Sequence, residues 1–137
     1  MELIASNKYK ECVLQGKESM STYFDENNIT WDYEKRLSIY LDLELYEVTD
    51  KEFIGYVAFR ETVDEFFLAD IQIFEEFRNK GYGTKILDKA KQIAKDLGHK
   101  QIMLKAFKAS PAIRLYERNG FSKIAEEEFV DVYQSNT

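Results

Sequence analysis

The strongest constraint on what this chain can fold into is a glycine-bearing turn between a strand-like segment and a helix-like segment. The turn, Arg78-Asn79-Lys80-Gly81-Tyr82-Gly83-Thr84, follows a β-branched and aromatic run at 66–74 and precedes a helical stripe of apolar residues at 82–97. The first turn of a helix carries main-chain N–H groups without internal partners and the positive end of the helix dipole. The two glycines leave anion oxygens room to approach the main chain, and an arginine and a lysine add positive charge. The sequence therefore predicts an anion site at this junction.

The spacing of the turn differs from that of two common phosphate-binding loops. A Walker loop ends in Gly-Lys-Ser/Thr, whereas Gly83 is followed by Thr84 and then Lys85. A dinucleotide-binding turn has a third glycine three residues after the second, where this chain has Ile86. Taken alone, the turn leaves two interpretations open: an anion site of another kind, or an ordinary loop leading into a surface helix.

The remaining segments predict a mixed α/β fold in one domain spanning residues 1–137. Polar connections between three consecutive strand-like runs favour an antiparallel meander. We expect Gly16 to interrupt the first helix, Asp32 to cap the second, and Gly98 to end the third in a left-handed conformation. The expected elements are a strand at 3–5, helices at 9–24 and after 32, strands at 43–48, 53–60 and 66–74, a helix at 82–97, a strand at 101–107, a helix at 110–119 and closing strands at 121–133.

Composition narrows the class of protein. A hydrophobic content of 45% supports a packed core, and a net charge of -6 argues against a nucleic-acid partner, because surfaces that track phosphates are usually basic. No apolar run approaches the roughly 20 residues that a membrane helix needs, and the amino terminus is too polar for a signal peptide. The single Cys12 implies no internal disulfide, and no spacing of Cys, His and carboxylates suggests a metal site. We expect a cytoplasmic protein.

Two blocks of sequence carry a family resemblance. The run Arg-x-x-Gly-x-Gly at 78–83, which opens a long helix, resembles motif A of the GNAT superfamily of N-acetyltransferases. The block at 110–121, with its Pro-Ala…Leu-Tyr…Gly-Phe pattern, resembles motif B of that superfamily. The resemblance extends from about Phe53 to Phe121. It implies the GNAT acyl-CoA N-acyltransferase fold, a mostly antiparallel sheet flanked by helices, in which the parallel fourth and fifth strands splay apart.

The resemblance also implies that acetyl-CoA is the co-substrate. Main-chain N–H groups from Asn79 through Thr84 would hold its pyrophosphate, and the pantetheine arm would pair with the main chain of Ile71 and Ile73. One of those N–H groups would polarise the thioester carbonyl. Many family members carry Asn where this chain has Ser110, so a direct contact from the shorter serine and a pure helix-capping role both stay open. The expected coenzyme-binding residues are Ile71, Ile73, Arg78, Asn79, Lys80, Gly81, Tyr82, Gly83, Thr84 and Ser110.

Two side chains are the candidates for proton transfer. The resemblance assigns protonation of the leaving thiolate to Tyr116, the tyrosine of the Leu-Tyr pair, although the same ring could serve only as core. For the general base we select Asp70, the carboxylate nearest to the expected splay; alternation along the strand places it on the opposite side of the sheet from Ile71 and Ile73. His99 follows a helix stop and is expected to be an exposed turn residue. Two alternatives to a carboxylate base stay open, a water chain and no dedicated base if the amine arrives neutral. The other carboxylates that stay open as bases are Glu44, Glu47, Glu75 and Glu76.

These features together predict an N-acetyltransferase that moves the acetyl group to a primary amine. We expect direct transfer in a ternary complex, because no cysteine lies near the motifs to carry an acyl group. Acidic residues of the amino-terminal helices could attract the amine. Two alternatives stay open: a non-catalytic acyl-CoA sensor of the same fold, and a peptide or protein acetyltransferase with an open cleft beside Trp31 and Tyr40. The sequence also leaves a homodimer open.

Overall fold

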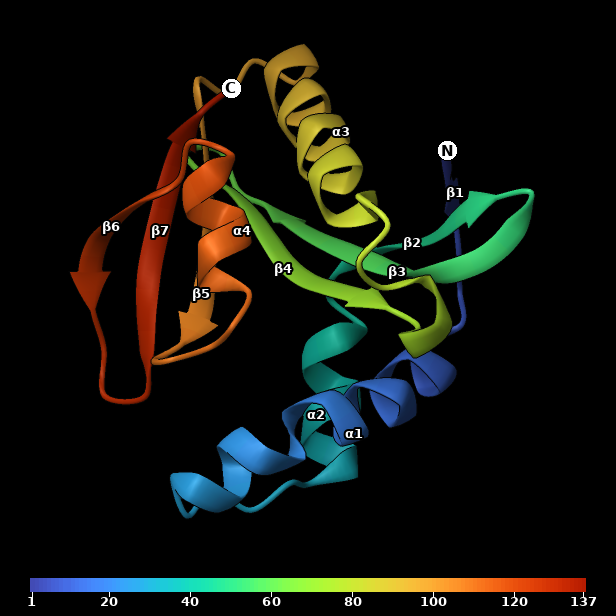
Figure 1. Ribbon diagram of the computed structural model, residues 1–137, viewed down its shortest axis with the longest axis vertical. Helices are drawn as coiled ribbons and strands as arrows, with labels where there is room; N and C mark the ends of the chain where they lie inside the picture. The colour runs from blue at the N-terminus through green and yellow to red at the C-terminus, as the bar shows by residue number, and fades with distance from the viewer.

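The computed structural model describes residues 1–137 as one seven-stranded sheet with helices on both faces (Figure 1). The strand order is β1-β2-β3-β4-β5-β7-β6, and every neighbouring pair is antiparallel except β4 and β5. The elements are β1 (Glu2–Ala5), α1 (Tyr9–Glu26), α2 (Tyr33–Tyr40), β2 (Glu44–Asp50), β3 (Glu52–Glu61), β4 (Phe66–Ile73), the 3-10 turn η1 (Glu75–Phe77), α3 (Tyr82–Asp96), β5 (Gln101–Phe107), α4 (Ile113–Arg118), β6 (Ser122–Glu126) and β7 (Val130–Asn136). The predicted mixed sheet and the antiparallel meander of β2, β3 and β4 are confirmed.

The sheet separates two cores. Alternate residues of β3 point to opposite faces, so that Val57 and Phe59 belong to a core of 15 buried residues while Tyr56 and Ala58 belong to one of 7. The larger core is covered by the apolar stripe of α3, and α4 packs beside it. The smaller core is covered by α1 and α2. A residue of the central strands therefore faces either the α3 side or the α1 side.

The parallel strands β4 and β5 pair only at their beginnings. Phe67 and Leu68 lie opposite Met103 and Leu104, and beyond that point β4 keeps β3 as its only partner while β5 keeps β7. Figure 1 shows the two strands diverging from this contact. The splay predicted from the family resemblance is thus present, and it opens the middle of the sheet.

A β-bulge in β4 determines which side chains face which core. Asp70 pairs with Ala58 but Leu68 already pairs with Phe59, so Ala69 is the extra residue. Without the bulge, strict alternation would place Leu68 and Asp70 on one face. With it, Leu68 lies in the larger core, while Asp70 bonds Tyr40 on the α2 side. Ile71 packs against the larger core, so Asp70 faces away from it as alternation predicts.

Local predictions about the helices were partly right. Asp32 caps α2 by accepting a hydrogen bond from the Lys35 N–H (3.2 Å), and Gly98 has φ +92° after the end of α3. The predicted interruption at Gly16 is wrong, because α1 continues through it and a Cβ there would lie 2.9 Å from the Gln72 amide. Close helix-to-strand packing therefore explains this glycine. No helix combines the length and apolar character needed to cross a bilayer.

Candidate functional site

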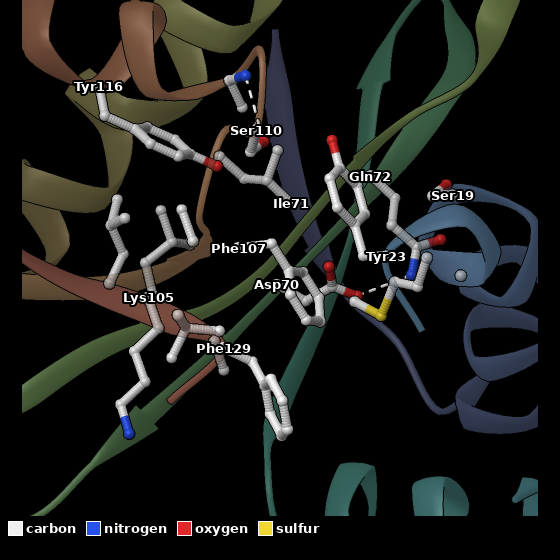
Figure 2. Close-up of a pocket in the computed structure, with 18 of the residues that line it drawn as sticks. Ser19, Tyr23, Asp70, Ile71, Gln72, Lys105, Phe107, Ser110, Tyr116 and Phe129 are labelled. Atoms are coloured by element: carbon white, nitrogen blue, oxygen red, sulfur yellow. Dashed lines mark hydrogen bonds between the residues drawn. The ribbon is translucent and has the colours of Figure 1, made fainter. Parts of the chain in front are cut away.

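A cavity of about 990 Å³ fills the splay between β4 and β5. Its walls come from the second half of β4, the end of β5, the side of α1, the start of α4 and the connection between β6 and β7. Figure 2 shows side chains from these elements pointing into the same space. Six predicted site residues line it: Asp70, Ile71, Ile73, Arg78, Ser110 and Tyr116. The other predicted residues, at 79–84, lie outside the cavity lining, in the turn that begins just after Arg78.

The turn before α3 presents main-chain donors without acceptors. No N–H group from Asn79 through Thr84 donates to a main-chain carbonyl. Asn79 at φ 61° and Gly81 at φ 83° both adopt the left-handed conformation, and Gly81 is the N-cap of α3. A Cβ built on Gly81 would meet nothing within 4 Å, so the space outside this turn is open. Free donors at the positive end of a 15-residue helix suit a diphosphate.

The two glycines of the turn have different roles. Gly81 needs its positive φ and faces open space, as expected for a residue beside an anion. Gly83 is buried, and a Cβ there would lie 2.6 Å from a methyl group of Leu115 on α4. The expectation that both glycines clear space for phosphate is therefore wrong for Gly83, which instead lets α3 and α4 pack closely. The side chain of Tyr82 also turns away from the helix entrance, because its hydroxyl donates to Asp50 at 2.8 Å.

The second half of β4 offers a free main-chain edge to the cavity. The Phe74 N–H bonds Ile54 O on the β3 side, so alternation directs the main-chain groups of Ile71 and Ile73 toward the splay. The Arg78 guanidinium occupies the end of that edge, because its Nε donates to Ile73 O at 2.9 Å. The free edge resembles the edge of a sheet that accepts an added strand.

Tyr116 projects from α4 into the cavity. In Figure 2 its hydroxyl points toward Ile71, while the ring packs edge-on against Phe121 at 6.2 Å between centroids. Burial raises the pKa of Tyr116 to about 12, with smaller contributions from Asp70 and Tyr23. At neutral pH the phenol therefore keeps its proton and can donate it or a hydrogen bond into the cavity.

Ser110 lies at the turn before α4. Its hydroxyl accepts a hydrogen bond from the Ala112 N–H at 3.3 Å, and its carbonyl accepts one from Ile113. The helix predicted from 110 to 119 is shorter than expected, because α4 begins at Ile113 after a turn formed by the preceding residues. Ser110 thus closes the turn into α4 and lines the cavity at the same time.

Asp70 is held at the α1 side of the cavity by two donors on one oxygen. Tyr40 Oη donates to Asp70 Oδ2 at 2.8 Å, and Gln72 Nε2 donates to the same oxygen at 2.6 Å. Figure 2 shows the other carboxylate oxygen pointing into the cavity. Gln72 Nε2 also reaches Cys12 O at 3.1 Å, which ties this group to α1. The carboxylate therefore has a fixed orientation and one oxygen available to a ligand.

The surroundings of Asp70 favour proton uptake. The residue is 8% exposed, and burial raises its pKa above the ordinary range of an aspartate. The hydrogen bonds from Gln72 and Tyr40, the charge of Arg36 and the main-chain N–H of Ile71 oppose that shift without reversing it. A buried carboxylate with a raised pKa is a stronger base than one at the surface, and this one faces the cavity that also contains Tyr116.

The other groups considered from sequence lie away from the cavity. Glu47 pairs with Lys8 at 3.3 Å. His99 lies beyond the opposite end of α3, but the expectation that it is exposed is wrong, because its side chain is 11% exposed and pairs with Glu61 at 2.6 Å. Tyr40, beside which an open cleft would favour a peptide acceptor, is 4% exposed and does not belong to the lining. Neither the other candidate bases, Glu44, Glu75 and Glu76, nor Trp31 belongs to the lining.

The sequence analysis missed the aromatic side chains that line the cavity from α1, β5 and the connection between β6 and β7. Tyr23 stacks on Phe107 with centroids 5.0 Å apart, and Phe129 completes this aromatic surface (Figure 2). Strand alternation could have found Gln72, two residues after Asp70 on the same face. The aromatic wall has no such signal, because it joins residues more than eighty positions apart.

The comparisons with known proteins concern the family and the fold. The model of the acetyltransferase (GNAT) family matches residues 9–121. No curated protein sequence matches the chain.

Solved structures with the same fold include several acetyltransferases. A GNAT family acetyltransferase from Elizabethkingia anophelis with acetyl-CoA bound is 20% identical, with a TM-score of 0.64 over 76% of this chain and 83% of that one. PaiA N-acetyltransferase from Thermoplasma acidophilum in complex with coenzyme A is 16% identical, with a TM-score of 0.69 over 100% of both chains. Nourseothricin acetyltransferase is 20% identical with a TM-score of 0.62, and the match spans 69% of this chain but 65% of that enzyme. At these identities the likeness shows the fold.

Proposed function

Since this chain belongs to the acetyltransferase (GNAT) family, we propose that it moves the acetyl group of acetyl-CoA directly to the primary amine of a small molecule. The single observation that carries this proposal is the cavity between β4 and β5, which contains a fixed carboxylate, a protonated phenol and a free main-chain edge. We treat residues 1–137 as the single catalytic domain.

The free donors of the chain fit the two ends of the coenzyme. The N–H groups from Asn79 through Thr84 would bind the pyrophosphate at the start of α3, with Arg78 and Lys80 adding charge. The main chain of Ile71 and Ile73 would bind the amide-bearing pantetheine arm as an added strand. Ser110 lines the same space and can donate its hydroxyl proton there.

Asp70 and Tyr116 would handle the protons of the reaction. The amine nitrogen forms a bond to the acetyl carbon as the bond from that carbon to sulfur breaks. Asp70 accepts the proton that the nitrogen loses, and Tyr116 supplies a proton to the departing thiolate, so the products are an N-acetyl amine and coenzyme A. A main-chain N–H at Ile71 would stabilise the negative charge that develops on the acetyl oxygen. Proton exchange with water returns both side chains to their starting states.

The cavity favours a small molecule over a peptide acceptor. An open groove beside Tyr40 and Trp31 would favour a peptide, whereas Tyr40 is buried and bonds Asp70. Trp31 packs against Tyr33 at 6.1 Å and lies outside the lining. The structure offers no feature that favours the non-catalytic sensor.

The test is release of free thiol from acetyl-CoA in the presence of single amines, polyamines, amino acids and peptides, with the acetylated product identified by mass spectrometry. We expect thiol release that depends on one class of small amine and yields one N-acetyl product per thiol. Calorimetry of acetyl-CoA binding runs in parallel. Tight binding without turnover on any acceptor would overturn the catalytic proposal and favour the sensor.

A further inference from the structure

Arg36 is an unpaired cation in the wall of the cavity. It projects from α2, is half-buried and belongs to no ion pair. Its guanidinium lies 5.7 Å from the Phe24 ring centroid and 5.4 Å from that of Tyr40, and its Nη2 reaches Met20 Sδ at 3.6 Å. A guanidinium is always charged and carries five N–H donors in a planar fork. Aromatic faces and one sulfur leave those donors available to an anion.

The remaining cations of the lining already have partners. Lys105 pairs with Glu127 at 3.1 Å, and Arg78 Nε bonds Ile73 O at the coenzyme end. The acidic residues of α1 and α2 that were expected to attract a cationic amine do not belong to the lining. The charge that α2 contributes to the cavity is therefore positive, and it belongs to Arg36.

Tyr40 brings Arg36 and Asp70 to the same part of the cavity. Its ring lies beneath the Arg36 guanidinium, while its hydroxyl donates to Asp70. The two opposite charges are close enough for Arg36 to oppose the rise in the Asp70 pKa, yet they form no ion pair. A ligand with an amine and a carboxylate on the same carbon would match this pair, with the amine at Asp70 and the carboxylate at Arg36.

The surface beside this pair is apolar. It consists of Met20, Phe24, the stacked Tyr23 and Phe107, and Phe129. Such a wall favours an aliphatic or aromatic substituent over a second charged group, because a charge placed against it would lose its hydration. The lining contains two further carboxylates, Glu127, which pairs with Lys105, and Glu128 next to Phe129. A polyamine has no carboxylate for Arg36 and leaves that cation without a partner.

From this arrangement we propose that the acceptor is an α-amino acid with an apolar side chain, and that Arg36 binds its carboxylate. The inference rests on the proposed function and names its substrate class. Arg36 is a specificity-determining residue in this scheme and takes no part in the proton transfers.

The test compares L-phenylalanine with phenethylamine, which lacks only the carboxylate. For the unmodified protein we expect kcat/KM to favour the amino acid by on the order of 10-fold to 100-fold, the range of a charge-assisted hydrogen-bonded pair. Arg36→Met should remove that preference by lowering kcat/KM for phenylalanine much more than for phenethylamine, and Arg36→Lys should retain part of the preference. Any change that Arg36→Met causes in the pKa of Asp70 should affect the two acceptors alike, so the ratio of their kcat/KM values reports the carboxylate contact. Lys35→Met is the matched control, because it removes one positive charge from the exposed side of α2.

Two results would overturn the inference: equal or better use of phenethylamine by the unmodified protein, or an equal loss for both acceptors in Arg36→Met. Calorimetry of N-acetyl-L-phenylalanine and N-acetylphenethylamine with the coenzyme A-loaded protein tests Arg36 without turnover. If no amine is acetylated, the proposed function fails, yet tighter binding of the carboxylate-bearing product that depends on Arg36 still supports the carboxylate site. If acetylation proceeds but the two products bind alike, the function stands and the inference fails.

Discussion

The two ends of the proposed binding site, which joins the cavity to the turn at 79–84 outside it, are built from different kinds of chemical group. At the end nearest α3, the groups that face open space belong to the main chain: the N–H groups of the turn at 79–84 and the free edge of β4. At the end nearest α1, they are side chains: Asp70, Arg36 and an aromatic wall. The first end is made by 14 consecutive residues at 71–84, whereas the second joins residues that lie between 20 and 129.

This difference explains how each end can vary. Main-chain donors depend on backbone conformation, which a few positions control, so many side chains can change without loss of the site. A site made of side chains changes its ligand with a single substitution. A coenzyme end of the first kind and an acceptor end of the second would let one fold serve many acceptors.

The largest loss of activity should follow from a substitution at the acceptor end, the end with Asp70, Arg36 and the aromatic wall. Asp70→Asn keeps the shape of the side chain but removes its basicity, so we expect kcat/KM to fall by about 10²-fold to 10⁴-fold. Acetyl-CoA affinity should stay within about threefold, because the coenzyme contacts lie elsewhere. Steady-state kinetics with calorimetry measures both. Full activity in this variant would remove Asp70 as the base and leave a water chain.

The raised pKa of Asp70 predicts how activity and stability depend on pH. Asp70 must be ionised to accept a proton, and burial raises its pKa, so kcat/KM should fall on the acid side at a pH above the ordinary aspartate range, near 3.8. The free energy of unfolding should change with pH in the opposite direction from activity. Between about pH 4 and the raised pKa, Asp70 is still protonated in the folded protein but already ionised in the unfolded chain. The protein therefore becomes less stable as the pH rises through this range. Asp70→Asn should remove that decline in a series of denaturant titrations.

The next largest effect is a loss of acetyl-CoA affinity, expected for a substitution at the coenzyme end, residues 71–84. Gly81→Leu forces a side chain into the left-handed region and into the space where the pyrophosphate would bind, so we expect acetyl-CoA affinity to fall by on the order of 100-fold. Gly98→Leu is the matched control. Gly98 has φ +92°, ends the same helix and also faces open space, so it should incur a similar strain with unchanged affinity. Equal losses in the two variants would contradict a site at the start of α3.

Sequence reasoning predicted several local conformations of the chain correctly. The turn at 78–84, the left-handed Gly98 and the strand at 101–107 depend on neighbouring residues, and each was predicted. The acceptor end depends on contacts across the sheet. The side chain of Asp70 faces α2 because the bulge at Ala69 places it on the opposite face of the sheet from Leu68. No local feature of the sequence predicts that bulge. Arg36 and Tyr40 are one helical turn apart. This spacing predicts that they share one face of the helix, but it does not predict which residues that face contacts.

Tyr116 lies between the two ends, and its removal should give a smaller loss. Tyr116→Phe keeps the ring against Phe121 and removes only the hydroxyl. We expect kcat to fall by about 10-fold to 100-fold with little change in the KM for acetyl-CoA, because the proton is needed only as the thiolate leaves. A thioester with a more acidic leaving thiol should show a smaller loss in this variant. Unchanged turnover would assign the ring to packing alone.

The smallest effect on function should come from the second glycine of the turn. Gly83→Ala would place a methyl group 2.6 Å from Leu115, so α3 and α4 must separate slightly, and we expect stability to fall by about 1–3 kcal/mol. Acetyl-CoA affinity should change far less than in Gly81→Leu, because the Gly83 Cβ position points into the protein. Adding Leu115→Val should return part of the lost stability by shortening the side chain that the new methyl group meets. If Gly83→Ala instead lost affinity at unchanged stability, the Gly83 Cβ position would face the bound pyrophosphate, and close packing of α3 on α4 would not explain this glycine.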